Sequence, residues 1–257
     1  MYEWNEFPFD NSAFDYQGEA LRKIWNDLHD GDREPFPEDE HLQEAWRCYH
    51  RGDFQQAVIL ADETGLQGHA VANKATGMYA SHLEKNENRQ IDCYETAISR
   101  AEKAIAEYPN EANSHHFYAF NLGRYSQSIS IVKALKQGVG GKIMNALSSA
   151  LEIDPNHADA HTALGLYHAE IIDKIGKLIG GVTYGVSERK AIEHFKKALA
   201  LAPDSPIAHI EYGNGLYMLY GDDRVDEVSG LYEQATEFIP RDAVEKLDIE
   251  LALAEFE

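Results

Sequence analysis

Four amphipathic segments of the chain each end at a proline, namely Pro109, Pro155, Pro203 and Pro240. Proline cannot continue a helix and also restricts the residue before it, so each proline predicts a helix end. Before each proline, three residues recur at steps of four and three. They are Ala97, Ala101 and Ala104; Ile143, Leu147 and Ala150; Ala191, Phe195 and Ala198; and Val228, Tyr232 and Ala235. These steps place each set on one helix face, and the small members allow a second helix to pack closely.

The segments that follow the prolines recur as well, which predicts a second helix in each repeat. A histidine lies six residues after each of the first three prolines, at His115, His161 and His209. We interpret these histidines as packing residues at one equivalent position. The next recurring positions hold Tyr118, Leu164 and Tyr212, followed by Ala119, Gly165 and Gly213.

The starts of these second helices carry capping residues. Ser205 before Pro206 is typical of an N-cap with proline at the first helical position. We expect Asn110 and Asn156 to cap the equivalent helices. No alternating apolar pattern typical of a strand is present, so the chain is predicted to be almost wholly helical.

Together these motifs resemble the tetratricopeptide-repeat (TPR) signature, over roughly residues 38–240. The resemblance rests on Leu164, Gly165, Ala191, Phe195, Ala198, Pro203, Tyr212 and Gly213, with a degenerate earlier copy in Trp46, Gly52, Asp53, Phe54 and Ala57. It implies an all-α, right-handed superhelix of antiparallel helix pairs. We expect a capping helix and loop in residues 1–37, the repeat array in 38–240, and a capping helix in 241–257.

The repeats are longer than the standard 34 residues or so, because successive prolines lie 46, 48 and 37 residues apart. The surplus falls near residues 126–141 and 172–186, between the two helices of a repeat. Glycine-bearing inserts at this place resemble those of the regulator-of-microtubule-dynamics family and of the TPR component of TRAP transporters.

The two inserts are unusual in charge. The chain carries a net charge of −21, yet residues 112–151 and 174–187 contain no Asp or Glu. Either the inserts are buried against each other, or they lie side by side as an apolar, mildly basic surface for a partner or a second copy. The predicted insert surface consists of Lys133, Lys136, Lys142, Lys174, Lys177 and Tyr184.

The TPR resemblance also implies a groove lined by the first helix of each pair. The groove residues that it implies are Asn113, His116, Phe120, Arg124, Asp159, Thr162, Leu166, Glu170, Ile207, Ile210, Asn214, Tyr217 and Met218. Of the Lys/Asn clamp with which some TPR domains bind peptide carboxylates, only Asn214 matches, so acidic C-terminal tails are not the expected ligand.

Motifs for catalysis are missing or incomplete. His157 and His161 have zinc-ligand spacing, but His168 is too far along the same helix to complete a site with them. Gly138–Lys142 departs from a phosphate loop at both ends, and no G-x-S-x-G motif occurs. We therefore expect no catalytic residue, metal or cofactor, and interpret the chain as a scaffold that binds a protein or peptide. The alternatives are a small-ligand carrier with an apolar pocket under the inserts and a metal-dependent hydrolase.

Composition narrows the setting and the partner. The acidic charge disfavours nucleic acid and favours a basic or apolar partner, and a homo-oligomer is possible on the same surface. Two cysteines indicate no disulfide framework. With no signal-peptide pattern and no apolar run long enough to span a membrane, the sequence predicts a cytoplasmic protein.

Overall fold

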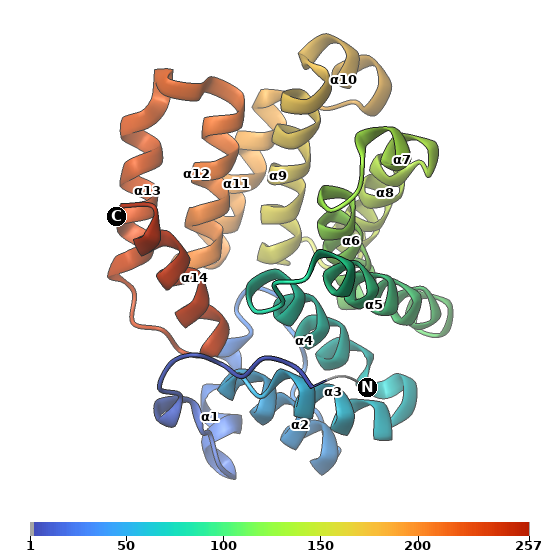
Figure 1. Cartoon of the computed structure of the whole chain (residues 1–257), viewed down its shortest axis with the longest axis vertical. Coiled ribbons are helices and arrows are strands. Elements are labelled where there is room, and N and C mark those ends of the chain that lie inside the picture. The colour runs from blue at the N-terminus through green and yellow to red at the C-terminus, as the bar shows by residue number, and fades with distance from the viewer. Residues whose placement is uncertain (1–2, 257) are drawn as a thin grey trace. The chain divides into compact units, whose positions relative to one another are not determined.

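A computed structural model describes residues 3–256, and this part of the chain consists of helices with no strand (Figure 1). The prediction of an all-α, TPR-like fold is confirmed. The helices are α1 (Glu19–Leu28), α2 (Glu40–Arg51), α3 (Phe54–Glu63), α4 (His69–His82), α5 (Glu87–Glu107), α6 (Ala112–Gln127), α7 (Ile131–Lys136), α8 (Val139–Ile153), α9 (Ala158–Ile175), α10 (Lys177–Tyr184), α11 (Glu188–Leu201), α12 (Pro206–Tyr220), α13 (Val225–Glu237) and α14 (Ala243–Ala254), with short 3₁₀ turns at Ser12–Phe14, Gly65–Gly68 and Gly221–Arg224.

The chain divides into two compact units. The first comprises Met1–His29, Arg33–Ile153 and Arg241–Val244, and the second comprises Asp30–Asp32, Asp154–Pro240 and Glu245–Glu257. In the first unit α2 pairs with α3, α4 with α5, and α6 with α8. Its largest fully buried side chains include Trp46, Tyr49 and Phe117.

In the second unit α9 pairs with α11 and α12 with α13, and α12 also packs against α9. The core forms around Phe195, whose ring stacks on that of Tyr212 at a centroid distance of 5.0 Å. Gly165 permits this packing, because a Cβ there would lie 2.8 Å from the Phe195 ring. Gly213 likewise leaves space for the ring of Tyr232 in the next repeat. These glycines explain why a small residue recurs on the first helix of each pair, opposite a large residue of the second helix.

Of the three N-cap residues expected from the sequence, the structure confirms one and corrects two. Ser205 caps α12 through its hydroxyl oxygen, and Pro206 is the first helical residue, as predicted. The expected caps Asn110 and Asn156 were wrong by one residue, since Glu111 and His157 hold the N-cap positions of α6 and α9. His157 accepts the amide hydrogen of Ala160 at its Nδ1 atom, 3.1 Å away. Its buried ring satisfies a backbone donor that a helix start leaves unpaired.

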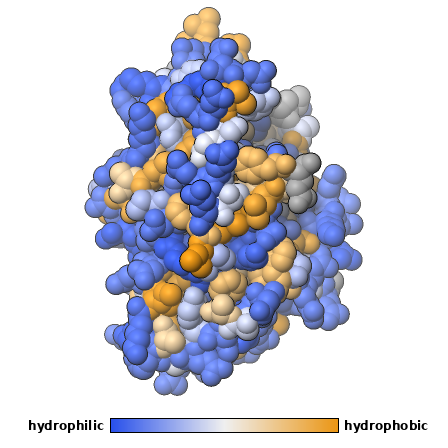
Figure 2. Space-filling model, turned by 90° about the vertical axis from the view of Figure 1, so that its left-hand side faces the viewer, coloured by the Kyte–Doolittle hydropathy of each residue, from blue (hydrophilic) through white to orange (hydrophobic). Residues whose placement is uncertain are grey.

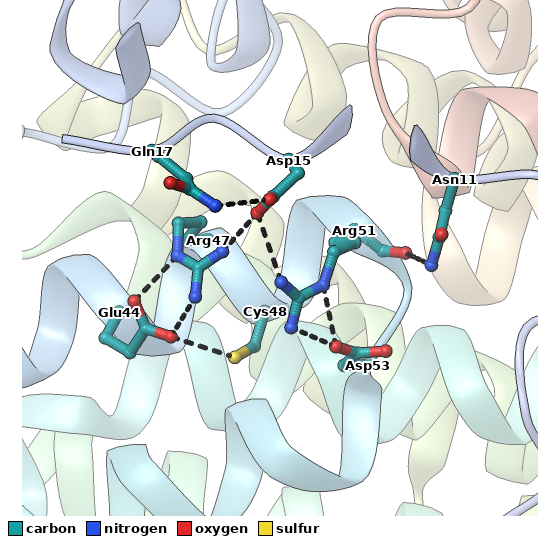
Figure 3. A network of polar contacts seen from close by, with 8 residues as sticks. All are labelled: Asn11, Asp15, Gln17, Glu44, Arg47, Cys48, Arg51 and Asp53. Carbon is teal, nitrogen blue, oxygen red and sulfur yellow. Dashed lines mark hydrogen bonds and ion pairs between the residues drawn. The ribbon is translucent and has the colours of Figure 1, made fainter. Parts of the chain in front are cut away.

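Charged contacts hold the segment before α1, here called the N-terminal arm, onto α2 (Figure 3). The guanidinium of Arg47 donates hydrogen bonds to Asp15 and Glu44, and that of Arg51 donates to Asp15 at 3.1 Å and to Asp53. A hydrogen bond from Gln17, together with the two arginines, keeps the pKa of Asp15 below its usual value. The arm is therefore attached by a network of ions as well as by apolar packing.

Cys48 lies beside this network and is a buried free thiol. Burial and the nearby carboxylate of Glu44 raise its pKa to about 11. A thiol in this state stays protonated near neutral pH, and only the thiolate is an effective nucleophile or metal ligand. Cys48 is thus a core residue and does not support a catalytic interpretation.

Replacing Arg47 by methionine should lower the free energy of unfolding by about 1–2 kcal/mol, because two carboxylates lose a partly buried, charge-assisted donor. Urea unfolding near neutral pH would measure the change. Arg189→Met is the matched control, since the ion pair of Arg189 with Glu193 is exposed and should contribute less than about 0.5 kcal/mol. Equal effects of the two substitutions would show that the arm is not held by these contacts.

Candidate binding surfaces

The predicted groove residues of α6 are mostly enclosed. Asn113 and His116 are buried, while Phe120 and Arg124 are half-buried. Asn113 donates to the carboxylate of Glu34, with its Nδ2 atom 2.5 Å from Oε2. Phe120 packs on α4, because a Cβ at Gly77 would lie 2.6 Å from its ring. These side chains already have partners inside the first unit.

The groove residues of α9 and α12 lie in the second unit and differ in exposure. Thr162 and Ile210 are buried, and Tyr217 is the one exposed member of this set, with 55% of its surface accessible. Asn214 donates to Glu211 and accepts the hydroxyl hydrogen of Tyr232 at 2.5 Å. The half-buried members are Asp159, Leu166, Glu170, Ile207, Asn214 and Met218.

The first insert forms α7 and the opening turn of α8. Val139 and Ile143 of α8 are buried in the first unit, whereas Lys133, Lys136 and Lys142 are exposed. Lys133 places its Nζ atom 5.4 Å from the ring centroid of Tyr125, a cation–π distance. The insert is therefore anchored on one side and presents its lysines on the other.

The second insert is mainly α10, which packs on the end of α9 through a glycine. A Cβ at Gly180 would lie 2.9 Å from Val186 and 3.2 Å from Ile171, so this side of the helix is in close contact. Gly176 and Gly185, with φ values of 82° and 66°, provide backbone conformations at the two ends of α10 that other residues rarely adopt.

Away from Gly180, α10 presents three aliphatic side chains to solvent. Leu178, Ile179 and Val182 are 81%, 60% and 83% exposed, and their spacing places them on one side of the helix. We call these three residues the α10 ridge. Figure 2 shows apolar residues (orange) among the hydrophilic ones on the face that it draws, and a small group of them at the upper edge of its view. Single exposed apolar residues are ordinary on protein surfaces, but three adjacent ones on an eight-residue helix are not.

Two lysines, Lys174 and Lys177, precede the α10 ridge in the chain, and both have intrachain carboxylate partners. Lys177 donates to Glu188 at 2.7 Å, which raises the pKa of the lysine, and Lys174 lies 3.8 Å from Glu170. Tyr184 is half-buried. The sequence interpretation therefore chose the charged residues of this insert as the surface, whereas the aliphatic residues are the more exposed part of it. The sign that could have identified them was the apolar triplet between Gly176 and Gly185 in a stretch without acids.

The three recurring histidines all contact backbone carbonyl oxygens. The Nε2 atoms of His115 and His161 lie 2.9 and 3.1 Å from the carbonyl oxygens of Pro109 and Pro155, six residues earlier. His209 instead contacts the carbonyl oxygen of Ser205 through Nδ1, at 2.9 Å. Each ring thus contacts the backbone near the start of its helix, and that of His209 also packs against Phe238, with ring centroids 5.2 Å apart.

Two further features bear on the alternatives. Among residues 3–256, no group of three or more His, Cys, Asp or Glu side chains is arranged to hold a metal ion. A surface hollow of about 740 Å³ lies between α3 and α5, lined by Asp62, Glu95, Arg100 and Lys103 among others. Its lining carries charges of both signs and includes no insert residue, so it is not the apolar carrier pocket that was considered.

None of the described helices is both long and apolar enough to cross a membrane.

Comparison with known proteins gives one family and several similar folds. The model of the family described as regulator of microtubule dynamics protein 1-3 matches residues 69–209, more than half of the chain. No curated protein matches the chain. The solved structure of TTC0263, a thermophilic TPR protein of Thermus thermophilus, aligns with a TM-score of 0.59 at 18% identity, over 85% of this chain and 100% of that one. MamA aligns with a TM-score of 0.42 at 17% identity, over 86% of this chain and 99% of that one.

Proposed function

The chain belongs to the regulator of microtubule dynamics protein 1-3 family, and from this premise we propose that it is a non-catalytic scaffold that binds another protein. The TPR-like fold supports a role in protein interaction, although a fold alone names no partner. The family description connects those relatives with the regulation of microtubule dynamics, a process in which the ligands of a scaffold are other proteins.

The α10 ridge is the observation that carries this proposal. Leu178 and Val182 are more than 80% exposed, so a partner can still remove most of their surface from water. Complete burial of such a side chain contributes about 1.5–3 kcal/mol, and several together can offset part of the cost of association. We therefore place the centre of the interface at the α10 ridge, with Lys174 and Lys177 at its rim.

The partner that fits this surface presents an apolar patch. Both rim lysines already have an intrachain carboxylate partner, so they add little attraction for a strongly acidic ligand. Lys133, Lys136 and Lys142 of the first insert form a separate acid-free, exposed element on the first unit. In the groove, Tyr217 is the residue with the most surface left to contribute, and aromatic residues of this kind are frequent energetic centres of interfaces.

The double substitution Leu178→Glu and Val182→Glu should abolish partner capture, with recovery of the specific partner reduced at least about tenfold. Two charges would be desolvated at the centre of the interface without a partner. Affinity purification from matched cell extracts with quantitative mass spectrometry would compare wild type and variant. The melting temperature should hardly move, because the substituted side chains are exposed.

Ile239→Glu is the matched control, because Ile239 is an isolated exposed aliphatic residue, with 87% of its surface accessible, outside both inserts. It should capture the same proteins as wild type. If the double variant and Ile239→Glu recover identical protein sets, the α10 ridge is not the interface. A small molecule retained by purified wild type in native mass spectrometry would instead support the carrier alternative.

A further inference from the structure

Three histidines of the second unit meet between α9 and α11. His161 and His168 lie on α9, two turns apart, and His194 of α11 contacts both. The Nδ1 atoms of His161 and His194 are 2.8 Å apart, a hydrogen-bond distance. The ring of His168 stacks on that of His194, with centroids 5.9 Å apart and planes inclined by 22°. We call these three residues the imidazole cluster.

The protonation of the two bonded rings follows from their partners. Nε2 of His161 faces the carbonyl oxygen of Pro155, which can only accept, so this nitrogen carries the hydrogen. In the neutral ring, Nδ1 of His161 is then an acceptor. His194 must therefore donate from its own Nδ1, and the bond between α9 and α11 exists in this form only while Nδ1 of His161 is unprotonated.

We propose that the imidazole cluster is an acid-sensitive latch that holds α9 against α11 at neutral pH and releases the pair on acidification. Protonation of both rings would set two N–H groups face to face across the 2.8 Å gap, turning a bond into a repulsion, whereas after a single protonation the neutral ring can still accept by carrying its hydrogen on Nε2. Protonation of His168 would place a charge in a site where only 2% of the residue is exposed and where its Nδ1 atom has no hydrogen-bond partner among the described residues.

The charges around the imidazole cluster reinforce this behaviour. Lys190 and Lys197 of α11 oppose protonation of the rings, and Glu193 beside His194 favours it. Burial is the main cause that lowers the pKa of His168 and of His194 to about 4, and it also lowers that of His161.

The sign of the pH effect follows from these lowered values. The unfolded chain binds more protons than the folded one, because free histidine has a pKa of about 6.5. The stability contributed by neutral rings is complete above about pH 6.5 and is lost as the pH falls from there toward about 4. Midway through this range each such histidine raises the unfolding constant by up to about tenfold per pH unit lost, and by less near either end.

Release would also affect α10, since the insert connects the two helices. Its anchor Gly180 packs between Ile171 of α9 and Val186, which precedes α11. The test of the latch does not depend on the proposed partner, because it measures only the stability of the chain.

His194→Asn tests the latch, because asparagine retains a side-chain amide donor but cannot take up a proton at these pH values. Urea unfolding of the full chain, followed by far-ultraviolet circular dichroism, gives the unfolding constant of each variant at pH 6.5 and 5.0. The increase in this constant between pH 6.5 and 5.0 should be about 15-fold smaller for His194→Asn than for wild type, because one histidine that is half protonated in the unfolded chain at pH 6.5 no longer titrates.

His115→Asn is the matched control. His115 makes the same contact to a proline carbonyl as His161, and the structure gives it no imidazole neighbour among the described residues. It should retain the pH dependence of wild type. Equal pH dependence of His194→Asn and wild type would overturn the latch. If His194→Asn does not fold, NMR of histidine-labelled wild type decides: ring signals of His168 and His194 with midpoints near pH 4 support the latch, and midpoints near 6.5 overturn it.

Discussion

Replacing Phe195 by alanine should lower the free energy of unfolding by about 3–5 kcal/mol, because the ring is 1% exposed and joins three helices of the second unit. Phe195 lies on α11, stacks on Tyr212 of α12, and touches α9 at Gly165. It also meets Gly215, where a Cβ would lie 2.4 Å from the ring. Neighbouring helices cannot easily collapse onto the space left by the ring, so both the transfer and the cavity contributions are lost.

Urea unfolding near pH 7, followed by far-ultraviolet circular dichroism, would measure this loss. Ile239→Ala is the control, since its exposed side chain should contribute less than about 0.5 kcal/mol. A Phe195→Ala variant as stable as Ile239→Ala would mean that α9, α11 and α12 do not pack around this ring.

Replacing Trp46 by alanine should have an effect of similar size, about 3–5 kcal/mol, on the first unit. Its ring is 2% exposed and meets Trp25 and His29 edge to face, at centroid distances of 5.7 and 4.7 Å. It also stacks on His50 at 5.7 Å, and the ammonium of Lys74 lies 5.9 Å from its centroid. Edge-to-face aromatic pairs add about 0.5–1.5 kcal/mol beyond burial, so the loss should lie toward the upper end of that range.

Fluorescence of the two remaining tryptophans, Trp4 and Trp25, would follow unfolding of this variant. Trp4→Ala is the natural comparison, because Trp4 is half-buried and stacks on Tyr79 alone among its described aromatic neighbours, at 4.0 Å. We expect it to cost less than half as much. A larger loss for Trp4→Ala than for Trp46→Ala would contradict the view that α2 carries the core of the first unit.

The repeat core could be predicted from the sequence because its signals are local. Phe195 and Ala198 fall on one face of a helix that ends before Pro203, and Gly165 occupies the position where an aromatic residue needs space. Such spacings depend on helix geometry and hold in every repeat.

Long-range polar contacts could not be predicted in this way. Arg47 lies 32 residues from Asp15, and His194 lies 33 residues from His161. No helical period relates such positions, so the spacing of His161 and His168 on one helix could not show that His194 of another helix contacts both. The capping error at Asn156 has a similar cause, because histidine is an uncommon cap and its burial at that turn depends on the packed neighbours.

The candidate surface was only partly visible in the sequence. The absence of acids between Lys174 and Ser187 drew attention to the correct segment, but charge patterning favoured the lysines. Which side of α10 faces solvent depends on the contact of Gly180 with Ile171 and Val186, and this contact follows from tertiary packing.

Site-specific photo-crosslinking at Val182 tests the central claim most directly. A photoreactive phenylalanine analogue placed at Val182, in the middle of the α10 ridge, should crosslink in cells to a discrete protein partner. The same analogue at Ile239, which is equally exposed, should not give that product. A crosslinked protein at position 182 that is absent at 239, and is lost when Leu178→Glu is added, is the predicted result. Identical crosslinking at both positions, or no protein product at position 182, would contradict the account.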